Sequence, residues 1–275
     1  MIEALSYPFF QNALLAGLLA SVATGVIGSF VVVKRISSLS GGLSHAAFGG
    51  VGLGYLIGIS PMLGALGFGL LAALIISAVY LHRQGSLDSL ISMVWSVGMA
   101  LGVVFIAMTP GYVPDLSGYL FGNILFVPRQ FLLYALLVDL LVCLCVFLLF
   151  NRLELVCFDE EFANVVGVRA GLIFTALLLL VALVVVTLIR VVGVILTIAL
   201  LTTPAVIARQ WSDDLGRMMA LAVGISGFCV VGGLFLSYWL AAAHAWNIPT
   251  GPLIILIATL VFGVSAIVHK RCHTS

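Results

Sequence analysis

The sequence has few charged residues and none of the common motifs of enzyme chemistry. Of its 275 residues, 8% are charged and 63% are hydrophobic, whereas about a quarter of the residues of a soluble domain are charged. A G-x-x-x-x-G-K-[ST] nucleotide loop is absent, because neither Lys34 nor Lys270 stands in that context. The HExxH and GxSxG motifs of metalloproteases and serine hydrolases are absent too. We therefore expect a membrane chain that makes and breaks no covalent bonds itself.

Net charge and cysteine spacing give no reason to expect a nucleic-acid partner or a structural metal cluster. The formal net charge is +1, and the charged residues gather between apolar runs. The five cysteines contain no CxxC pair and no zinc-knuckle spacing. Most lie in or near apolar runs, where a cysteine is usually a small hydrophobic core residue. We assign them no function.

Long apolar runs dominate the chain. A membrane-spanning helix needs about 20 apolar residues, with a range of about 17–25, so the second and seventh runs are marginal and are candidates for re-entrant or broken segments. The first run follows Glu3 rather than a basic stretch and is too long for a signal-peptide core, which indicates a retained span. The nine runs cover roughly 10–33, 44–59, 62–81, 88–109, 131–150, 171–189, 192–208, 218–241 and 252–269. We predict an all-α polytopic membrane protein with eight or nine spans and no soluble domain.

Basic residues indicate the orientation, because cytoplasmic loops carry an excess of lysine and arginine. Basic residues follow each odd-numbered run, namely Lys34, Arg35, Arg83, Arg152, Arg209, Arg217, Lys270 and Arg271. Nine crossings with the N-terminus outside and the C-terminus in the cytoplasm satisfy this pattern. Arg129 and Arg190 are exceptions, as single charges on the outer side.

A histidine stands near the start of the second run. Ionisable groups at membrane depth usually face a cavity and often mark a transport path. On a helix, His45 shares one face with Gly49 and Gly52, which predicts an imidazole beside uncrowded backbone. We therefore interpret this run as a pore-lining helix, with His45 and the preceding Ser44 as pathway candidates. A histidine that hydrogen-bonds a neighbouring helix is the alternative.

The opposite face of the same run carries a stripe of small residues. Gly50, Gly54 and Gly58 recur every four residues, and such a stripe lets two membrane helices approach closely. We predict helix packing through these three glycines.

Two other runs contain residues that are unusual at membrane depth. Asp139 lies midway along the fifth run, where an unpaired carboxylate is costly, so we take it as a second pathway candidate. Thr202, Thr203 and Pro204 lie in the seventh run. Pro204 cannot donate to the carbonyl of Leu200, which predicts a kink or break, with the threonine hydroxyls satisfying the freed carbonyls. A broken helix is also a common way to build a gate in a transporter.

The longest polar interruption on the expected cytoplasmic side, about 151–170, contains a segment 157–169 with helix-forming character. Its first turn is acidic, which suits the helix dipole; the acidic residues are Asp159, Glu160 and Glu161. Ala163 and Gly167 are four residues apart and form a small-residue spot that another surface could approach. An ordinary amphipathic connector is the alternative interpretation.

Four separate segments form a pattern that covers nearly the whole chain. The first consists of 31–35 with 43–46, and the other three are 118–123, 159–167 and 192–205. The Gly-Pro pair at 251–252 also fits the pattern. In order and spacing they resemble the permeases of the zinc/manganese family of ABC importers. The matching features are a basic exit before a histidine-bearing segment, a short outer segment, an ATPase-docking loop and a Gly-to-Pro span.

The resemblance implies a fold, partners and a cargo. It implies one transmembrane permease domain over 1–275, of the type II ABC-importer kind, in the cell (inner) membrane. It also implies a homodimer with the pathway along its axis, two cytoplasmic ATPase subunits docked at 157–169, and an extracytoplasmic metal-binding protein. The cargo would be zinc or manganese, with no permanently bound cofactor and no activity as an enzyme.

One departure from the family pattern affects the metal site. Many members carry an aspartate four residues before the histidine, which would place carboxylate and imidazole on one helix face. This sequence has Gly41 there. The missing aspartate leaves open an importer of a metal chelate such as a siderophore or cobalamin. A rival from another class is a stand-alone secondary carrier driven by an ion gradient.

Overall fold

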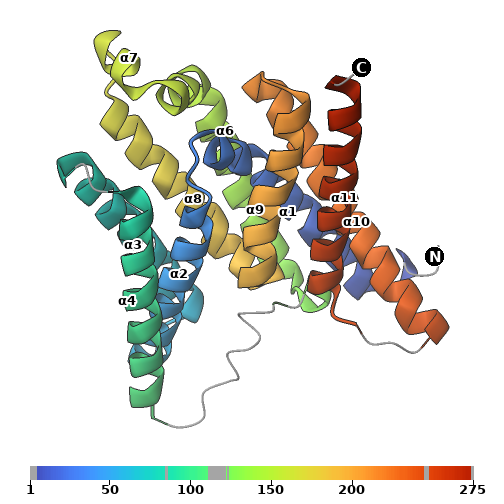
Figure 1. The fold of residues 1–275 in the computed structure, drawn as a ribbon. Coiled ribbons are helices and arrows are strands. Elements are labelled where there is room, and N and C mark those ends of the chain that lie inside the picture. Colours follow the sequence, from blue (N-terminus) through green and yellow to red (C-terminus); the bar gives the residue numbers. More distant parts are fainter. Residues whose placement is uncertain (1–4, 84–85, 111–121, 123, 245–247, 274–275) are drawn as a thin grey trace. The chain divides into compact units, whose positions relative to one another are not determined.

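The computed structural model describes residues 5–83, 86–110, 122, 124–244 and 248–273, and every regular element in those ranges is helical. Figure 1 shows these helices in chain order. Their bounds are α1 Pro8–Val33, α2 Ser38–Ile57, α3 Pro61–Arg83, α4 Leu87–Met108, η2 Ile124–Phe126, α6 Arg129–Phe158, α7 Glu160–Val165, α8 Ala170–Val192, α9 Val194–Trp211, α10 Leu215–His244 and α11 Thr250–His273. Of the 118–123 segment, only Gly122 belongs to the described residues.

Eight of the described helices are long and apolar enough to cross a membrane. They are α1, α3, α4, α6, α8, α9, α10 and α11. The prediction of an all-α, multi-pass membrane protein is therefore confirmed, with eight helices that qualify as spans by length and composition. The seventh predicted run, α9, qualifies with 18 residues. The second, α2, is a continuous helix of 20 residues but is not among the eight, because its glycines, serines and histidine lower its hydropathy.

The chain divides into two compact units. Unit 1 consists of Met1–Val32, Ser117–Cys143 and Val191–Ser275, and unit 2 consists of Val33–Leu116 and Leu144–Arg190. The chain therefore passes from one unit to the other directly after Val32, within α6, and close to the end of α8. Both units are built from candidate membrane spans.

In unit 2, α2 is the buried helix and packs against α3 and α4. Glycines make this packing close: a Cβ built on Gly50 would overlap the backbone of Gly64 on α3, and one on Gly54 would lie 2.8 Å from Cα of Pro61. These two glycines pack as predicted. Gly58 does not, because it lies after the helix as its C-cap, with φ 73° and nothing within 4 Å of a Cβ. Its left-handed conformation ends α2 instead.

In unit 1, α9, α10 and α11 pack against one another, and α1 joins them through close backbone contacts. A Cβ on Gly28 would overlap the carbonyl oxygen of Leu201 on α9, and one on Gly25 would lie 2.5 Å from the backbone nitrogen of Val223 on α10. The buried Thr24 and Ser226 hydroxyls lie 3.2 Å apart across the same α1–α10 contact. Close packing of small residues, as in other membrane helices, thus holds this unit together.

The helical structure is interrupted at Gly193, between α8 and α9, and not at Pro204. Gly193 separates α8 from α9 with φ 82° and ψ 167°, a conformation that is essentially restricted to glycine. By contrast, α9 continues as a helix through Pro204. The Thr202 hydroxyl donates to the carbonyl of Ile198 at 2.8 Å and not to that of Leu200. The predicted break at Pro204 is therefore wrong, because the surrounding helix tolerates one missing donor, whereas the predicted kink stays a prediction.

Candidate functional site

His45 lies on α2 where this helix packs against α4. Its ring stacks on that of Trp95, with centroids 4.4 Å apart and an interplanar angle of 6°. Its Nδ1 atom lies 3.2 Å from the sulfur of Met99, which is one turn further along α4. The histidine is half-buried. Two side chains of a neighbouring helix thus fix the plane and the direction of the imidazole.

The contact with Met99 determines which nitrogen of His45 is available to a ligand. A thioether sulfur can only accept a hydrogen bond, and weakly. The contact is a hydrogen bond only if Nδ1 carries the proton, and a neutral ring then keeps its lone pair on Nε2. Within the described chain Nε2 has no hydrogen-bond partner. Fixing one ring nitrogen so that the other can bind a metal is the usual arrangement around metal-binding histidines.

The backbone on the histidine's face of α2 is crowded. A Cβ on Gly49 would lie 2.8 Å from the carbonyl oxygen of Gly98, and one on Gly52 would lie 2.6 Å from that of Gly102. Both partners are on α4. The expectation of an imidazole beside uncrowded backbone is therefore wrong. These glycines serve the α2–α4 contact, which the two helices could not make as closely with larger residues.

Two further pathway candidates are buried polar groups without a recorded partner. The Ser44 hydroxyl and Oδ2 of Asp139 are buried, and neither has a hydrogen-bond partner in the part of the chain that the structure describes. Ser44 belongs with His45 to unit 2, whereas Asp139, on α6, belongs to unit 1. Among the described residues no three His, Cys, Asp or Glu side chains cluster closely enough to hold an ion.

The 157–169 segment folds as the end of α6, the short helix α7 and a tight turn. Asp159 is the N-cap of α7, and its carboxylate accepts from the backbone N–H of Phe162 at 2.9 Å. After α7, the N–H of Val168 donates to the carbonyl of Ala163 at 2.9 Å, and Gly167 has φ 87°. The side chain of Asn164 accepts from the N–H of Ala170, the first residue of α8. These bonds make the segment a structured connection and not a loose loop.

The exposed surface of this segment includes a group of apolar side chains, and of the predicted small-residue spot only Gly167 is exposed. Ala163 is completely buried, so it packs inward, and Gly167 ends the turn. The segment's exposed hydrophobic side chains form what we call the apolar ridge, beside the exposed Asp159, Glu161 and Asn164: Phe158, Phe162, Val165 and Val166, with Val165 85% exposed. Four exposed hydrophobic side chains around one short polar-capped helix are typical of an interaction site.

Lys34 contributes to this region although the sequence indicated it only as a topology marker. Its ammonium group forms an ion pair with Glu160 on α7 and donates to the carbonyl of Val156 on α6 at 3.0 Å. It also lies 5.8 Å from the ring centroid of Phe174 on α8. No spacing rule links residues this far apart in the chain, so the sequence carried no signal for the cluster.

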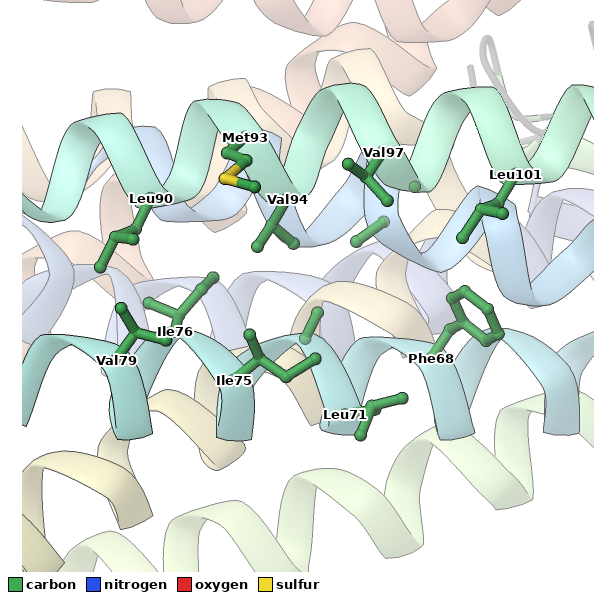
Figure 2. A pocket seen from close by; sticks show the side chains of 13 residues that line it. Phe68, Leu71, Ile75, Ile76, Val79, Leu90, Met93, Val94, Val97 and Leu101 are labelled. Carbon is green, nitrogen blue, oxygen red and sulfur yellow. The ribbon is translucent and has the colours of Figure 1, made fainter. Parts of the chain in front are cut away.

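A groove between α3 and α4 in unit 2 has a different chemistry. Its volume is about 720 Å³. Figure 2 shows Phe68, Ile75 and Val79 on one helix facing Leu101, Val97 and Val94 on the other. The lining offers no oxygen or nitrogen ligand from a side chain, so this groove cannot coordinate zinc or manganese.

Comparison with known proteins agrees with this architecture. The ABC 3 transport family matches residues 6–269. An uncharacterized membrane protein of Synechocystis is 41% identical over 266 residues, covering 96% of this chain and 92% of that protein. The manganese import system permease protein ScaB of Streptococcus parasanguinis is 34% identical over 265 residues, covering 96% and 92%.

The fold comparison gives the same result. The structure of PsaBC from Streptococcus pneumoniae in complex with Fab superposes with a TM-score of 0.83 at 31% identity, covering 96% of this chain and 93% of that one. The chain therefore belongs to the ABC 3 transport family, as a multi-pass permease subunit of the cell membrane and not an enzyme.

Proposed function

We propose that this chain is the permease of an ATP-driven importer of a divalent transition metal, with manganese as the first candidate cargo and zinc as the second. The observation that carries the proposal is the apolar ridge at α7, which offers a surface for a cytoplasmic ATPase. The choice of metal rests on relatives that are named as manganese importers. The importer would contain two copies of this chain, two ATPase subunits and an extracytoplasmic metal-binding protein.

We further propose that the ion meets His45 in passing, through Nε2. One imidazole without a carboxylate at Gly41 supplies a single ligand, whereas a closed zinc site needs about four. A single ligand suits a pathway, because the ion has to leave again. Ser44 and Asp139 are the other buried groups that could face the pathway.

Uptake into proteoliposomes tests the function directly. Purified permease is reconstituted with its ATPase and binding protein, and uptake of ⁵⁴Mn²⁺ and ⁶⁵Zn²⁺ is followed with and without ATP. We expect uptake only when all components and ATP are present. Uptake driven by a proton or sodium gradient without the ATPase would establish a secondary carrier instead. Uptake of a ferric siderophore or cobalamin, but of neither free ion, would establish a chelate importer.

Co-purification tests the docking surface. Replacing Phe162 and Val165 together by serine removes the two central side chains of the apolar ridge, and such exposed aromatic anchors often dominate an interface. We expect at least tenfold less ATPase on the tagged permease. The control is Asp213→Ser, at an exposed position between α9 and α10, which should retain wild-type amounts. Unchanged co-purification by the double variant would refute docking at the apolar ridge.

We propose that the N-terminus lies outside and the C-terminus in the cytoplasm, which requires an odd number of crossings and therefore that α2 crosses the membrane together with the eight candidate spans. Thiol labelling tests this orientation. A cysteine at Ser275, introduced after Cys272 is replaced, should resist an impermeant reagent in intact cells and react once the membrane is opened. The basic clusters motivate this expectation. Labelling of intact cells at the same rate as opened membranes would show that the C-terminus lies outside and that the proposed orientation is wrong.

A further inference from the structure

A single lysine connects the docking helix to three other parts of unit 2. The Lys34 ammonium pairs with Glu160 in the first turn of α7, donates to the Val156 carbonyl in the last turn of α6, and lies over the Phe174 ring of α8. Lys34 itself follows α1 directly. The C-terminal end of α6, the N-terminal end of α7 and the first turns of α8 therefore all lie around the Lys34 ammonium group.

The contacts of Lys34 are protected from water, unlike those of a surface ion pair. The side chains of Lys34 and Glu160 are 15% and 28% exposed, so solvent and salt screen the pair less than an exposed one. The carbonyl of Val156 is among the last four of α6, which have no partner within their helix. A cation there also suits the negative end of the helix dipole. Removing the lysine therefore leaves both a carboxylate and a carbonyl unsatisfied.

The docking helix depends on such contacts because it is too short to be stable alone. With six residues, α7 is far below the length at which isolated helices form in water. The Lys34–Glu160 pair connects α7 to the residue that follows α1, in addition to the Asp159 cap, the buried Ala163 and the hydrogen bond from the N–H of Ala170 to the side chain of Asn164. A displacement of α7 by a bound partner therefore acts on Lys34.

Lys34 occupies a special position in the chain. Unit 2 begins at Val33, so Lys34 stands where the chain passes from one unit to the other. The next residue, Arg35, has φ 59°, a left-handed conformation that is uncommon for a non-glycine residue and persists only where the surroundings enforce it. Ile36 is buried. The main chain is therefore fixed on both sides of the lysine, by the end of α1 at Val33 before it and by Arg35 and Ile36 after it.

We propose that Lys34 is the positioning residue that couples movement of the docking helix to the permease, through its contacts with Glu160 and Val156. This inference rests on the proposed function, because it assumes that an ATPase pushes or pulls on α7. Lys34 contacts neither the ion nor the ATPase in this arrangement. It transmits displacement of α7 to the point where the two units join along the chain.

Hydrogen exchange tests the anchoring without any partner. In the purified permease, Lys34→Met keeps the length of the side chain and removes the charge. We expect the amides of 160–166 to exchange about tenfold faster, and Glu160→Gln to have the same effect. The double variant should exchange no faster than either single variant, because both remove one interaction. Arg152→Gln and Glu154→Gln change charges at the same end of α6 and should leave this exchange unchanged.

Transport stoichiometry tests the coupling. In proteoliposomes with the ATPase and binding protein, Lys34→Met should retain bound ATPase and ATP hydrolysis but move at least fivefold fewer Mn²⁺ ions per ATP. Lys34→Arg should restore the ratio, because arginine keeps the charge and the donors. If Lys34→Met does not fold, Glu160→Gln, which leaves every spanning helix intact, supplies the same comparison.

The outcomes separate this inference from the proposed function. If the wild-type permease binds no ATPase, the proposed function fails while the exchange data still decide whether Lys34 anchors α7. If exchange rises but the number of ions per ATP stays at the wild-type value, Lys34 is structural only and the coupling role is refuted. Unchanged exchange in Lys34→Met refutes the anchoring as well.

Discussion

Gly50 and Gly64 meet backbone to backbone across α2 and α3: a Cβ built on either residue would overlap the carbonyl oxygen of the other. Neither helix can supply this contact with a larger residue, because the obstacle is main chain and cannot rotate away. The relationship defines how closely the buried helix of unit 2 lies against its neighbour.

The first prediction follows from this contact. Gly50→Ala should force α2 and α3 apart and lower the free energy of unfolding by about 1–3 kcal/mol, the usual cost of overpacking. Thermal unfolding in detergent, followed by tryptophan fluorescence, measures the change. Gly67→Ala on α3 is the control, since a Cβ there has nothing within 4 Å, and it should melt at or above the wild-type temperature. Equal melting temperatures for Gly50→Ala and Gly67→Ala would contradict the close contact between Gly50 and Gly64.

The second prediction separates the two roles of His45. His45→Phe keeps an aromatic ring that can stack on Trp95 but removes both nitrogens, whereas His45→Ala removes the stack as well. We expect both variants to lose metal uptake, and only His45→Ala to lose about 1–3 kcal/mol of stability. Uptake and melting are measured on the same preparation. Wild-type uptake by His45→Phe would show that the ion passes elsewhere.

A third prediction concerns the missing carboxylate. Gly41 is buried one turn before His45, so Gly41→Asp places a carboxylate on the same helix face. We expect tighter binding of Mn²⁺ or Zn²⁺ to the purified permease by calorimetry, together with slower uptake because release becomes slower. The double variant Gly41→Asp/His45→Phe should lose most of the gain. An affinity that is the same in Gly41→Asp and wild type would count against a pathway beside α2.

The fourth prediction concerns the joint between α8 and α9. Gly193→Ala should destabilise the protein by about 1–3 kcal/mol, because φ 82° with ψ 167° is strained for any residue with a Cβ. Gly224→Ala, in the interior of α10 with open space around its Cβ, is the matched control. Its melting temperature should stay the same or rise, since alanine favours a helix. A Gly193→Ala variant as stable as wild type would refute the strain.

The fifth prediction concerns Asp139. A buried carboxylate with an unsatisfied oxygen is costly in a membrane span. If it serves only as a packed residue, Asp139→Leu should raise the melting temperature and leave uptake unchanged. We expect instead that uptake falls while stability rises, as for a group retained for its contact with the ion. Unchanged uptake by Asp139→Leu would show that Asp139 does not contact the ion on its pathway.

Composition and the length of the apolar runs predicted the membrane class and nearly all of the spans, because each span needs its own apolar residues. Small-residue spacing predicted that Gly50 and Gly54 pack. It failed at Gly58, where the same residue type ends the helix through a positive φ. It also failed at Ala163, which packs inward, so that the exposed surface belongs to Phe162 and its neighbours.

Contacts between distant segments were beyond prediction. His45 stacks on Trp95, and Lys34 contacts Glu160 and Val156. These contacts depend on how the helices pack against one another, which a single sequence does not specify. At Pro204 the local chemistry predicts a kink or a break, but α9 continues through this residue without a break. Gly193 belongs to the Gly-to-Pro span of the family pattern, but only its backbone angles show that it forms the joint between α8 and α9.

The burial of α2 has a consequence for how the protein is made. A helix whose apolar content is this low gains little by entering lipid alone, and its glycine-rich faces would expose backbone to the acyl chains. Its favourable surroundings are α3 and α4, which come later in the chain. We therefore expect α2 to enter the bilayer together with these two helices and not before them.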